Sequence, residues 1–334
     1  MLTLRISANQ SQCQQSEYRS SSQICIIAGY YIGIYLFGRV VVVSKSLVLK
    51  RLKNNMIIMF IEDKIAKESM TINTPTPKII FFDIDDTLSR NGIIAEHNKA
   101  TLEQLAGTDI KLVISTGRSK AILPADILAL LEADVLDAII CMNGQYSFDK
   151  KGRISHYPLS AEQTDTIVRL CQQSELIHKF DSATHIAWSG ENERLGEFNA
   201  ITPNSIVDPE YHKGNTVYQC SVFFNNQQEK MQDVDFAQYE LKLVHWHHIG
   251  ADILPIEASK ARGIKDVCQY YGVDASECMA FGDGMNDLEM FDLVGYAVAM
   301  GDAKQELIAR ADFVTGTIEE RGIQSVLEQF HIAS

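Results

Sequence analysis

From residue 77 onward, short apolar runs alternate with segments of helical periodicity. The runs have the length of strands and are nearly continuous in hydrophobic residues: KIIFFD (78–83), IKLVIS (110–115), DAIICM (137–142), ECMAFGD (277–283) and YAVAM (296–300). Such strands are typical of a parallel sheet that is covered by helices on both faces. Helices are predicted between them, over residues 95–105, 119–131, 259–271 and 322–330. The pattern therefore predicts a doubly wound α/β core.

The pattern changes between residues 148 and 249. A hairpin signal (147–157) is followed by a predicted helix (161–173), short strands (176–182, 184–188, 216–224), a second helix (227–237) and a strand (240–246). A mixed, more antiparallel segment of about 100 residues within a parallel core is typical of an inserted domain. We therefore expect residues 77–147 and 250–334 to form the core and residues 148–249 to form an inserted α+β domain.

The first 76 residues do not follow this pattern. Residues 24–43 form an apolar stretch of about the length that spans a bilayer, which suggests a membrane anchor or an uncleaved signal. Arg39 lies inside this stretch, however, and a charged residue is costly within a membrane. We favour the alternative, a dispensable leader or a start of translation at Met70, just before the first core strand.

Charge separates the same two regions. Residues 1–69 carry nine Lys/Arg and four Asp/Glu, a net charge of +5, and the rest of the chain carries −18. An acidic body argues against nucleic acid as a partner, because such binding depends on basic side chains that neutralise phosphates. The seven cysteines never form a CxxC pair, so neither a disulfide framework nor a zinc site is predicted. Reduced thiols in the cytoplasm are expected.

Polar residues cluster at the predicted carboxyl ends of the core strands, where doubly wound sheets bind ligands. The first strand leads into Asp83 and Asp85. The second leads into a turn with Thr116 and Gly117, whose hydroxyl and backbone amides suit a phosphate group. The strand that ends near residue 283 supplies three more polar side chains: Asp283, Asn286 and Asp287.

Carboxylates from four aspartates in one pocket would repel one another: Asp83, Asp85, Asp283 and Asp287. Each like-charged pair at about 4 Å costs roughly 4 kcal/mol at an effective dielectric constant near 20. A hard divalent cation removes this cost, and Mg²⁺ suits a site of carboxylates, water and phosphate oxygens. Lys260, at the start of a predicted helix, is expected to add a fixed positive charge on a phosphoryl group.

The spacing of the first three aspartates separates their roles. In an extended segment, residues i and i+2 point to the same side, roughly 6.5 to 7 Å apart, so Asp83 and Asp85 can flank one phosphorus atom. One carboxylate can attack the phosphorus, and the other can protonate the leaving oxygen and later activate water. Asp86 points to the other side, and we expect it to tolerate replacement.

The motifs DIDDTL, ISTGR, a Lys before a helix and GDGMND, in this order, resemble the four motifs of the haloacid dehalogenase (HAD) superfamily of phosphohydrolases. The long insertion between the second and third motifs resembles the C2-type cap of the Cof-type subfamily (subfamily IIB). The resemblance covers residues 77–334 and implies a Rossmann-like core with an inserted cap. It also implies a Mg²⁺-dependent phosphatase acting on a small phosphorylated metabolite, such as a sugar phosphate or a phosphorylated cofactor, through an aspartyl-phosphate.

The resemblance assigns roles to individual residues. It makes Asp83 the nucleophile and Asp85 the general acid/base, with Thr116 and Lys260 on the phosphoryl oxygens and Asn286 orienting Lys260 or the phosphate. The implied Mg²⁺ ligands are Asp83, the backbone carbonyl of Asp85, Asp283 and, close by or through water, Asp287. The family pattern has Gly at the position of Asp86, so no role is implied for Asp86.

Three other functions remain open on the sequence. A phosphomutase of the same fold would use the same motifs. A signalling receiver module also gathers acidic residues, a Thr and a Lys around a phosphorylated Asp, but it has no use for Asp85 or for a large cap. A membrane-tethered binding protein with an inactive core would not need Asp83 and Asp85. The sequence names neither the substrate nor the oligomeric state.

Several further residues have an ordinary structural interpretation beside a functional one. Arg118 suits a surface cation, and Asn143-Gly144 suits a turn into the cap, although it also resembles a family segment that faces the site. The pair His245 and His247 lacks a third spaced metal ligand, so a role in a cap strand is favoured. Candidate specificity residues are found only by their place in the cap: Lys179, His185 and Trp188.

Overall fold

The computed structural model describes residues 76–191, 205–224, 231, 233–247 and 249–332, together with the backbone of five N-terminal strands. The chain divides into two units, Met1–Thr71 and Ile72–Ser334. In the first unit, strands pair antiparallel in two groups: β1 (Ile24–Ile27), β4 (Leu47–Leu52) and β5 (Asn55–Phe60), and β2 (Tyr31–Leu36) with β3 (Arg39–Ser44).

The membrane-anchor interpretation of residues 24–43 depends on side chains outside the described residues. Among the residues that the structure describes, no helix is long and apolar enough to cross a membrane.

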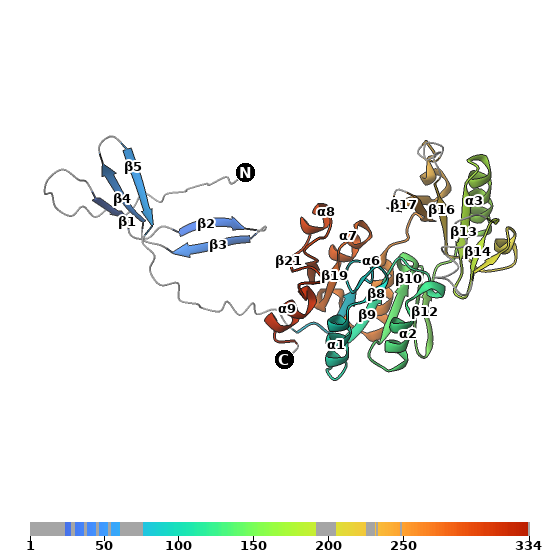
Figure 1. The fold of residues 1–334 in the computed structure, drawn as a ribbon, viewed down its shortest axis with the longest axis horizontal. Coiled ribbons are helices and arrows are strands. Elements are labelled where there is room, and N and C mark those ends of the chain that lie inside the picture. Colours follow the sequence, from blue (N-terminus) through green and yellow to red (C-terminus); the bar gives the residue numbers. More distant parts are fainter. Residues whose placement is uncertain are drawn as a thin grey trace. The chain divides into compact units, whose positions relative to one another are not determined.

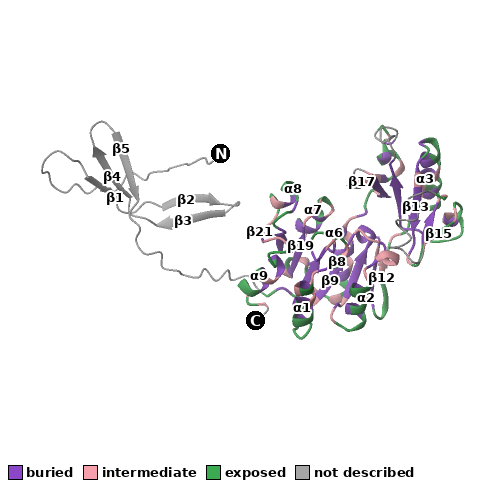
Figure 2. Cartoon of the chain, viewed as in Figure 1, coloured by how far each residue is buried: buried purple, intermediate pink, exposed green. Residues whose placement is uncertain are grey.

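The second unit contains an eight-stranded sheet, which we call the core sheet (Figure 1). In spatial order its strands are β12 (Gly152–His156), β11 (Tyr146–Asp149), β10 (Ala138–Cys141), β9 (Lys111–Ser115), β6 (Ile79–Phe82), β19 (Cys278–Gly282), β20 (Tyr296–Ala299) and β21 (Phe313–Val314). The pairs from β10 to β21 are parallel, and the β11–β12 hairpin is antiparallel at one edge. All four residues of the central strand β6 are fully buried, as its continuous apolar run predicts. Figure 2 shows that the neighbouring strand β9 is mostly buried as well.

Three helices of the core lie close to their predicted ranges: α1 (Glu96–Leu105), α6 (Lys260–Tyr271) and α9 (Gly322–Gln329). The core also contains α2 (Ala125–Glu132) and two short helices that were not predicted, α7 (Leu288–Phe291) and α8 (Gln305–Ile308). Short 3₁₀ turns are η1 (Lys120–Ile122), η2 (Met142–Gly144), η5 (Ala275–Glu277) and η6 (Met285–Asp287). The prediction of a single helix over 119–131 is wrong, because the chain forms the turn η1 and then the helix α2. Pro124 interrupts it: its ring keeps Leu123 extended (ψ 138°), and Pro124 itself caps α2.

A second, six-stranded and mainly antiparallel sheet forms the cap sheet. Its order is β15 (Ser205–Val207), β14 (Ile186–Trp188), β13 (Ile177–Asp181), β16 (Gln219–Phe223), β18 (Gly250–Pro255) and β17 (Leu241–His247). The cap also contains α3 (Ala161–Gln173), as predicted, and the turns η3 (Tyr211–Lys213) and η4 (Phe236–Tyr239). An apolar cluster of its own joins α3 to this sheet through Ile167, Cys171, Phe180 and Val222. Most of the helix expected over 227–237 lies outside the described residues or is the turn η4.

Three strands belong to a different sheet from the one that the sequence predicted. The hairpin β11–β12 extends the core sheet, and β18 belongs to the cap sheet. By sheet membership the chain therefore enters the cap after residue 156 and leaves it after residue 255, rather than at 148 and 250. Hydrophobic alternation gives the strands but not their partners, because pairing is set by contacts distant in sequence.

A small hairpin that the sequence did not predict follows the first motif. Its strands are β7 (Ser89–Arg90) and β8 (Ile93–Ile94). The two turn residues, Asn91 and Gly92, have φ of 54° and 77°, as the tight turn of a two-residue hairpin requires. Strands of two residues are too short to show a period.

Candidate active site

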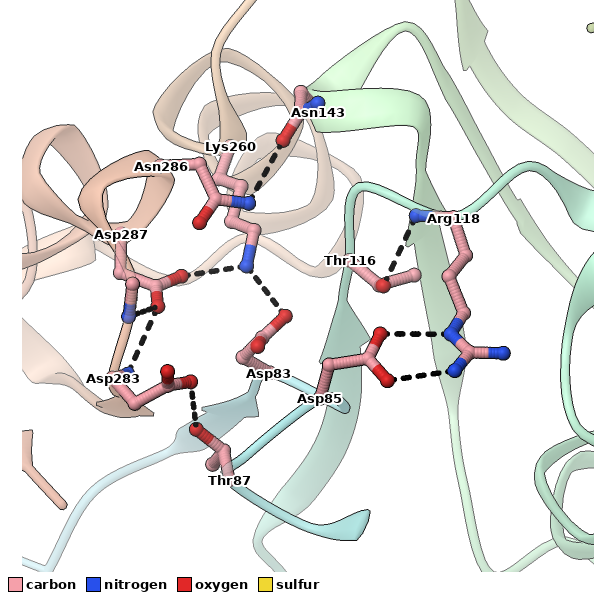
Figure 3. Close-up of polar contacts among 11 residues, drawn as sticks. Asp83, Asp85, Thr87, Thr116, Arg118, Asn143, Lys260, Asp283, Asn286 and Asp287 are labelled. Carbon is pink, nitrogen blue, oxygen red and sulfur yellow. Dashed lines mark hydrogen bonds and ion pairs between the residues drawn. The ribbon is translucent and has the colours of Figure 1, made fainter. Parts of the chain in front are cut away.

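The centre of the site is an ammonium group held between two carboxylates (Figure 3). Lys260 Nζ donates hydrogen bonds to Asp83 Oδ1 at 2.5 Å and to Asp287 Oδ1 at 2.6 Å. Asp83 directly follows β6, while Lys260 opens α6 and Asp287 ends η6. All three side chains are at least nine-tenths buried. The carboxyl ends of the strands and the start of α6 therefore converge, as the motif order predicted.

The position of Lys260 is fixed by local features of the chain. Ser259 caps α6, because its hydroxyl accepts a hydrogen bond from the backbone N–H of Arg262. Gly144, at the end of the loop after β10, packs against this helix start. A Cβ at Gly144 would lie 2.0 Å from the Ser259 carbonyl oxygen, and its φ is +83°, so only glycine suits this approach.

The fourth motif folds around its own aspartate. Asp287 Oδ2 accepts the backbone N–H groups of Asp283 and Gly284, at 3.0 and 2.9 Å. Thr87 donates from its hydroxyl to Asp283 Oδ1 at 3.0 Å, which ties the fourth motif to the first. Asp287 thus accepts three hydrogen bonds, one from Lys260 and two from the backbone, and holds the turn that carries Asp283.

The charges at this centre do not balance. Burial raises the pKa of Asp83 well above its usual value. The positive charge of Lys260 lowers this pKa, but the negative charges of Asp287 and Asp283 raise it, and the net shift is upward. Burial and then Asp287 raise the pKa of Asp283 to about 7. Burial would lower the pKa of Lys260, but Asp287 and Asp83 outweigh it, so that pKa is raised. One charged ammonium therefore faces three carboxylates and cannot keep all of them ionised.

The donor set suits a hard divalent cation. Carboxylate oxygens of Asp83, Asp283 and Asp287 lie within 4.8 Å of one another. Such oxygen donors are those that Mg²⁺ takes in proteins. A divalent cation would also supply the positive charge that these acids lack.

Asp85 points in a different direction from Asp83. Its carboxylate accepts two hydrogen bonds from Arg118, at 2.7 Å from Nε and 2.6 Å from Nη2 (Figure 3). The Asp85 side chain is 49% exposed, in contrast to the buried Asp83. The hydrogen bond to Asp85 raises the pKa of the Arg118 guanidinium. Arg118 is therefore the direct partner of Asp85, a contact that the sequence alone did not give.

The predicted phosphate-binding residues lie on loops that meet beside this centre. Thr116 is buried, and its hydroxyl accepts the backbone N–H of Arg118 at 3.2 Å. A Cβ at Gly117 would lie 3.3 Å from the amide of Asn143 and 3.6 Å from Nδ2 of Asn286. Asn286 in turn donates to Asn143 Oδ1 at 3.1 Å. Asn143 thus joins the second and fourth motifs, and its Asn-Gly pair at a strand end was the available sequence signal.

The candidate specificity residues in the cap have partners within the cap. Lys179 Nζ donates to both carboxylate oxygens of Asp181, at 2.7 and 2.8 Å. The ring centroids of Trp188 and Phe223 lie 5.1 Å apart, and those of His185 and Tyr211 lie 6.5 Å apart. His245 contacts the Phe224 ring at 5.5 Å, and the side chain of His247 lies outside the described residues.

Comparison with known proteins agrees with this geometry. A family model described as haloacid dehalogenase-like hydrolase matches residues 80–327. The Bacillus subtilis (strain 168) protein named "Putative phosphatase YkrA" is 32% identical over 262 residues, covering 75% of this chain and 97% of that protein. The 5-amino-6-(5-phospho-D-ribitylamino)uracil phosphatase YitU of the same organism is 28% identical over 275 residues, covering 76% and 97%.

A solved structure shows the same architecture. The HAD subclass IIB sugar phosphatase BT4131 matches with a TM-score of 0.68 and 28% identity, over 76% of this chain and 99% of that one. Both the parallel core sheet and the separate cap sheet agree with the haloacid dehalogenase fold. The chain therefore belongs to the haloacid dehalogenase-like hydrolases and is a phosphoric monoester hydrolase of the Cof-type (subclass IIB) branch.

Proposed function

We propose that the chain is a Mg²⁺-dependent phosphatase that hydrolyses a small phosphate monoester, a sugar phosphate or a phosphorylated cofactor, through an aspartyl-phosphate. The observation that carries the proposal is the contact of Asp83 with Lys260 among clustered acids at the carboxyl end of β6. An ionised aspartate beside a fixed cation is suited to attack phosphorus, and the cation lowers the cost of charge on the phosphoryl oxygens.

The reaction is divided between two carboxylates. A carboxylate oxygen of Asp83 forms a bond to phosphorus while the bond from phosphorus to the leaving oxygen breaks, and Asp85 delivers a proton to that oxygen. Asp85 then takes a proton from water, which attacks the phosphorus and releases phosphate and free Asp83. The exposed carboxylate of Asp85 has the access to solvent that the second half requires.

The phosphoryl group is bound by donors around Asp83. We assign this role to the Thr116 hydroxyl, the backbone at Gly117, the Lys260 ammonium and the Asn286 amide, because these loops adjoin one another. Mg²⁺ would be held by Asp83, the backbone carbonyl of Asp85 and Asp283, with Asp287 beside them. When bound, it supplies positive charge to the phosphoryl oxygens and keeps the nucleophile ionised.

The partner is a small phosphorylated metabolite in the cytoplasm. Relatives named for such substrates support the assignment of the substrate class. A phosphomutase of the same fold is the second candidate, because it would use the same acids. Formation of an isomeric ester instead of free phosphate would identify it.

A screen of phosphorylated metabolites with Mg²⁺ tests the proposal. We expect phosphate release by the wild-type chain and none by Asp83→Asn, which keeps the shape of the side chain but removes the nucleophilic charge. Acid-quenched wild type should retain label from ³²P-ester, and Asp83→Asn should not. No phosphate release from any ester, or equal release by both proteins, would overturn the proposal. A labelled aspartyl-phosphate that persists for hours would favour a signalling module.

A further inference from the structure

The turn η2, which follows β10, has three consecutive residues in the left-handed region. Met142, Asn143 and Gly144 have φ of 52°, 51° and 83°. This region is costly for methionine, less costly for asparagine and open to glycine. Strained backbone of this kind is retained where surrounding contacts fix it, and it is concentrated at functional sites. The contacts of η2 therefore indicate what the turn does.

Backbone hydrogen bonds fix η2 to the loop of the second motif. The N–H of Met142 donates to the Arg118 carbonyl at 2.9 Å, and the N–H of Asn143 donates to the Thr116 carbonyl at 3.1 Å. With its backbone held in this way, the buried side chain of Asn143 points toward the fourth motif and contacts Asn286 (Figure 3). The left-handed turn therefore sets the position of the Asn143 amide.

The amide of Asn286 is held in one orientation by its surroundings. Its Nδ2 donates to Asn143 Oδ1 at 3.1 Å, and a Cβ at Gly117 would lie 3.6 Å from the same nitrogen. Its Oδ1 lies against its own turn instead, where a Cβ at Gly284 would be 2.7 Å away. A side-chain amide nitrogen carries two N–H groups. One N–H of Asn286 is bound to Asn143, and the other remains beside Gly117.

We propose that Asn143 is a positioning residue for phosphoryl binding, because its side-chain oxygen selects the orientation of the Asn286 amide that offers an N–H to the phosphoryl group. The inference deepens the proposed function and rests on it, since that function places Asn286 on the phosphoryl oxygens. These oxygens accept hydrogen bonds, whereas a reversed amide would present its own carbonyl oxygen to them. The reversed amide would also bring two oxygens together at Asn143, and this disfavours it.

Two substitutions separate the Asn143 side chain from its backbone. Asn143→Gly removes the amide and keeps the left-handed turn, whereas Asn143→Ala removes the same amide and disfavours that turn. We expect both variants to bind orthovanadate about tenfold more weakly than the wild type in Mg²⁺, as measured by calorimetry, because one oriented donor to an anion is lost. Only Asn143→Ala should lower Tm. Asn91→Gly, at another left-handed asparagine (φ 54°), is the matched control and should change vanadate affinity by less than about twofold.

A double-mutant cycle distinguishes positioning from a merely structural role. If Asn143 acts through Asn286, Asn143→Gly in the Asn286→Ala background should weaken vanadate binding by less than about twofold further. The inference is overturned if Asn143→Gly binds vanadate as the wild type does, or if its loss is the same in both backgrounds. Absence of vanadate binding by the wild type also overturns it.

Failure of the proposed function has a different signature. A wild type that binds vanadate but releases phosphate from no ester overturns the proposed function, and the vanadate affinities of the variants still decide the role of Asn143. A wild type that releases phosphate, with an Asn143→Gly variant of unchanged vanadate affinity, overturns the inference alone.

Discussion

Arg118 holds the carboxylate of Asp85 through two parallel hydrogen bonds, so that Asp85 turns away from the ammonium that binds Asp83 (Figure 3). The planar guanidinium matches both carboxylate oxygens, a geometry that lysine cannot reproduce. The two aspartates at i and i+2 therefore have separate cations, and their roles are separated by these contacts as well as by spacing.

We expect Arg118→Lys to lower kcat roughly tenfold to a hundredfold on an ester with an alcohol leaving group, because Asp85 is no longer held in one orientation. Acetyl phosphate should be less affected, because acetate leaves without a proton. Steady-state kinetics on both substrates measure the difference. Arg310→Lys, in an exposed Arg–Asp pair on the surface, is the control. An equal loss on both substrates would contradict a role through Asp85.

Removal of the buried ammonium should destabilise the chain strongly. Lys260→Met leaves Asp83 and Asp287 without their shared partner, which we expect to cost about 3–5 kcal/mol of unfolding free energy. Urea denaturation measures this loss. A double variant that also carries Asp287→Asn should recover part of the lost unfolding free energy, because only Asp83 is then left as a buried carboxylate without a cation. An unchanged urea midpoint in Lys260→Met would show that the carboxylates find other partners.

Replacement of Asp86 should depend on backbone conformation rather than on charge. Asp86 has a φ of +58°, in the left-handed region. Asp86→Gly should therefore preserve stability, whereas Asp86→Val should cost roughly 1–2 kcal/mol. The ion pair with Arg90 is partly exposed and contributes little. Thermal unfolding of both variants tests this, and equal losses would assign the effect to the lost ion pair.

The acid cluster predicts how Mg²⁺ and pH act together on stability. The raised pKa of Asp283, about 7, means that the folded metal-free chain keeps a proton that the unfolded chain has lost. The contribution of this bound proton to the free energy of unfolding is fully present below the unfolded pKa of about 3.9. It is lost as pH rises through about 7. In EDTA we expect Tm to fall between about pH 5 and about pH 8, and less so in Asp283→Asn.

Saturating Mg²⁺ should reduce this fall, because the cation stabilises the ionised carboxylates. Its stabilising effect on Tm should therefore be larger at the higher pH. A Tm in EDTA that does not change over this interval would contradict the predicted proton uptake.

The sequence was sufficient for five parallel strands of the core sheet (β6, β9, β10, β19 and β20) and for several of the residues that meet at their carboxyl ends. Buried parallel strands are continuous apolar runs, and their carboxyl ends meet at one side, so Asp83, Thr116 and Asp283 could be brought together before any contact was known. Lys260 was found by its place before a helix, which the capping bond of Ser259 explains. These features depend on local pattern and chain direction.

The remaining features depend on contacts that local pattern does not encode. Pairing of β11 with β10 places the β11–β12 hairpin at the edge of the core sheet. Pairing of β18 with β16 places β18 in the cap sheet. The partners of side chains were also beyond the sequence, as with Arg118 for Asp85 and Thr87 for Asp283. The direction and the rotamer of each side chain decide which partner it contacts, and neither can be read from a single amino-acid sequence.

The last strand of the cap sheet ends at Pro255, and Lys260 follows five residues later. A chain of five residues reaches at most about 18 Å when fully extended. A folded turn shortens this reach, since the backbone N–H of Ala258 bonds to the Pro255 carbonyl. A short connection therefore joins the cap sheet to Lys260, whose ammonium group offsets the negative charge of Asp83 and Asp287. A movement of β18 would therefore be transmitted through this short connection to the backbone of Lys260.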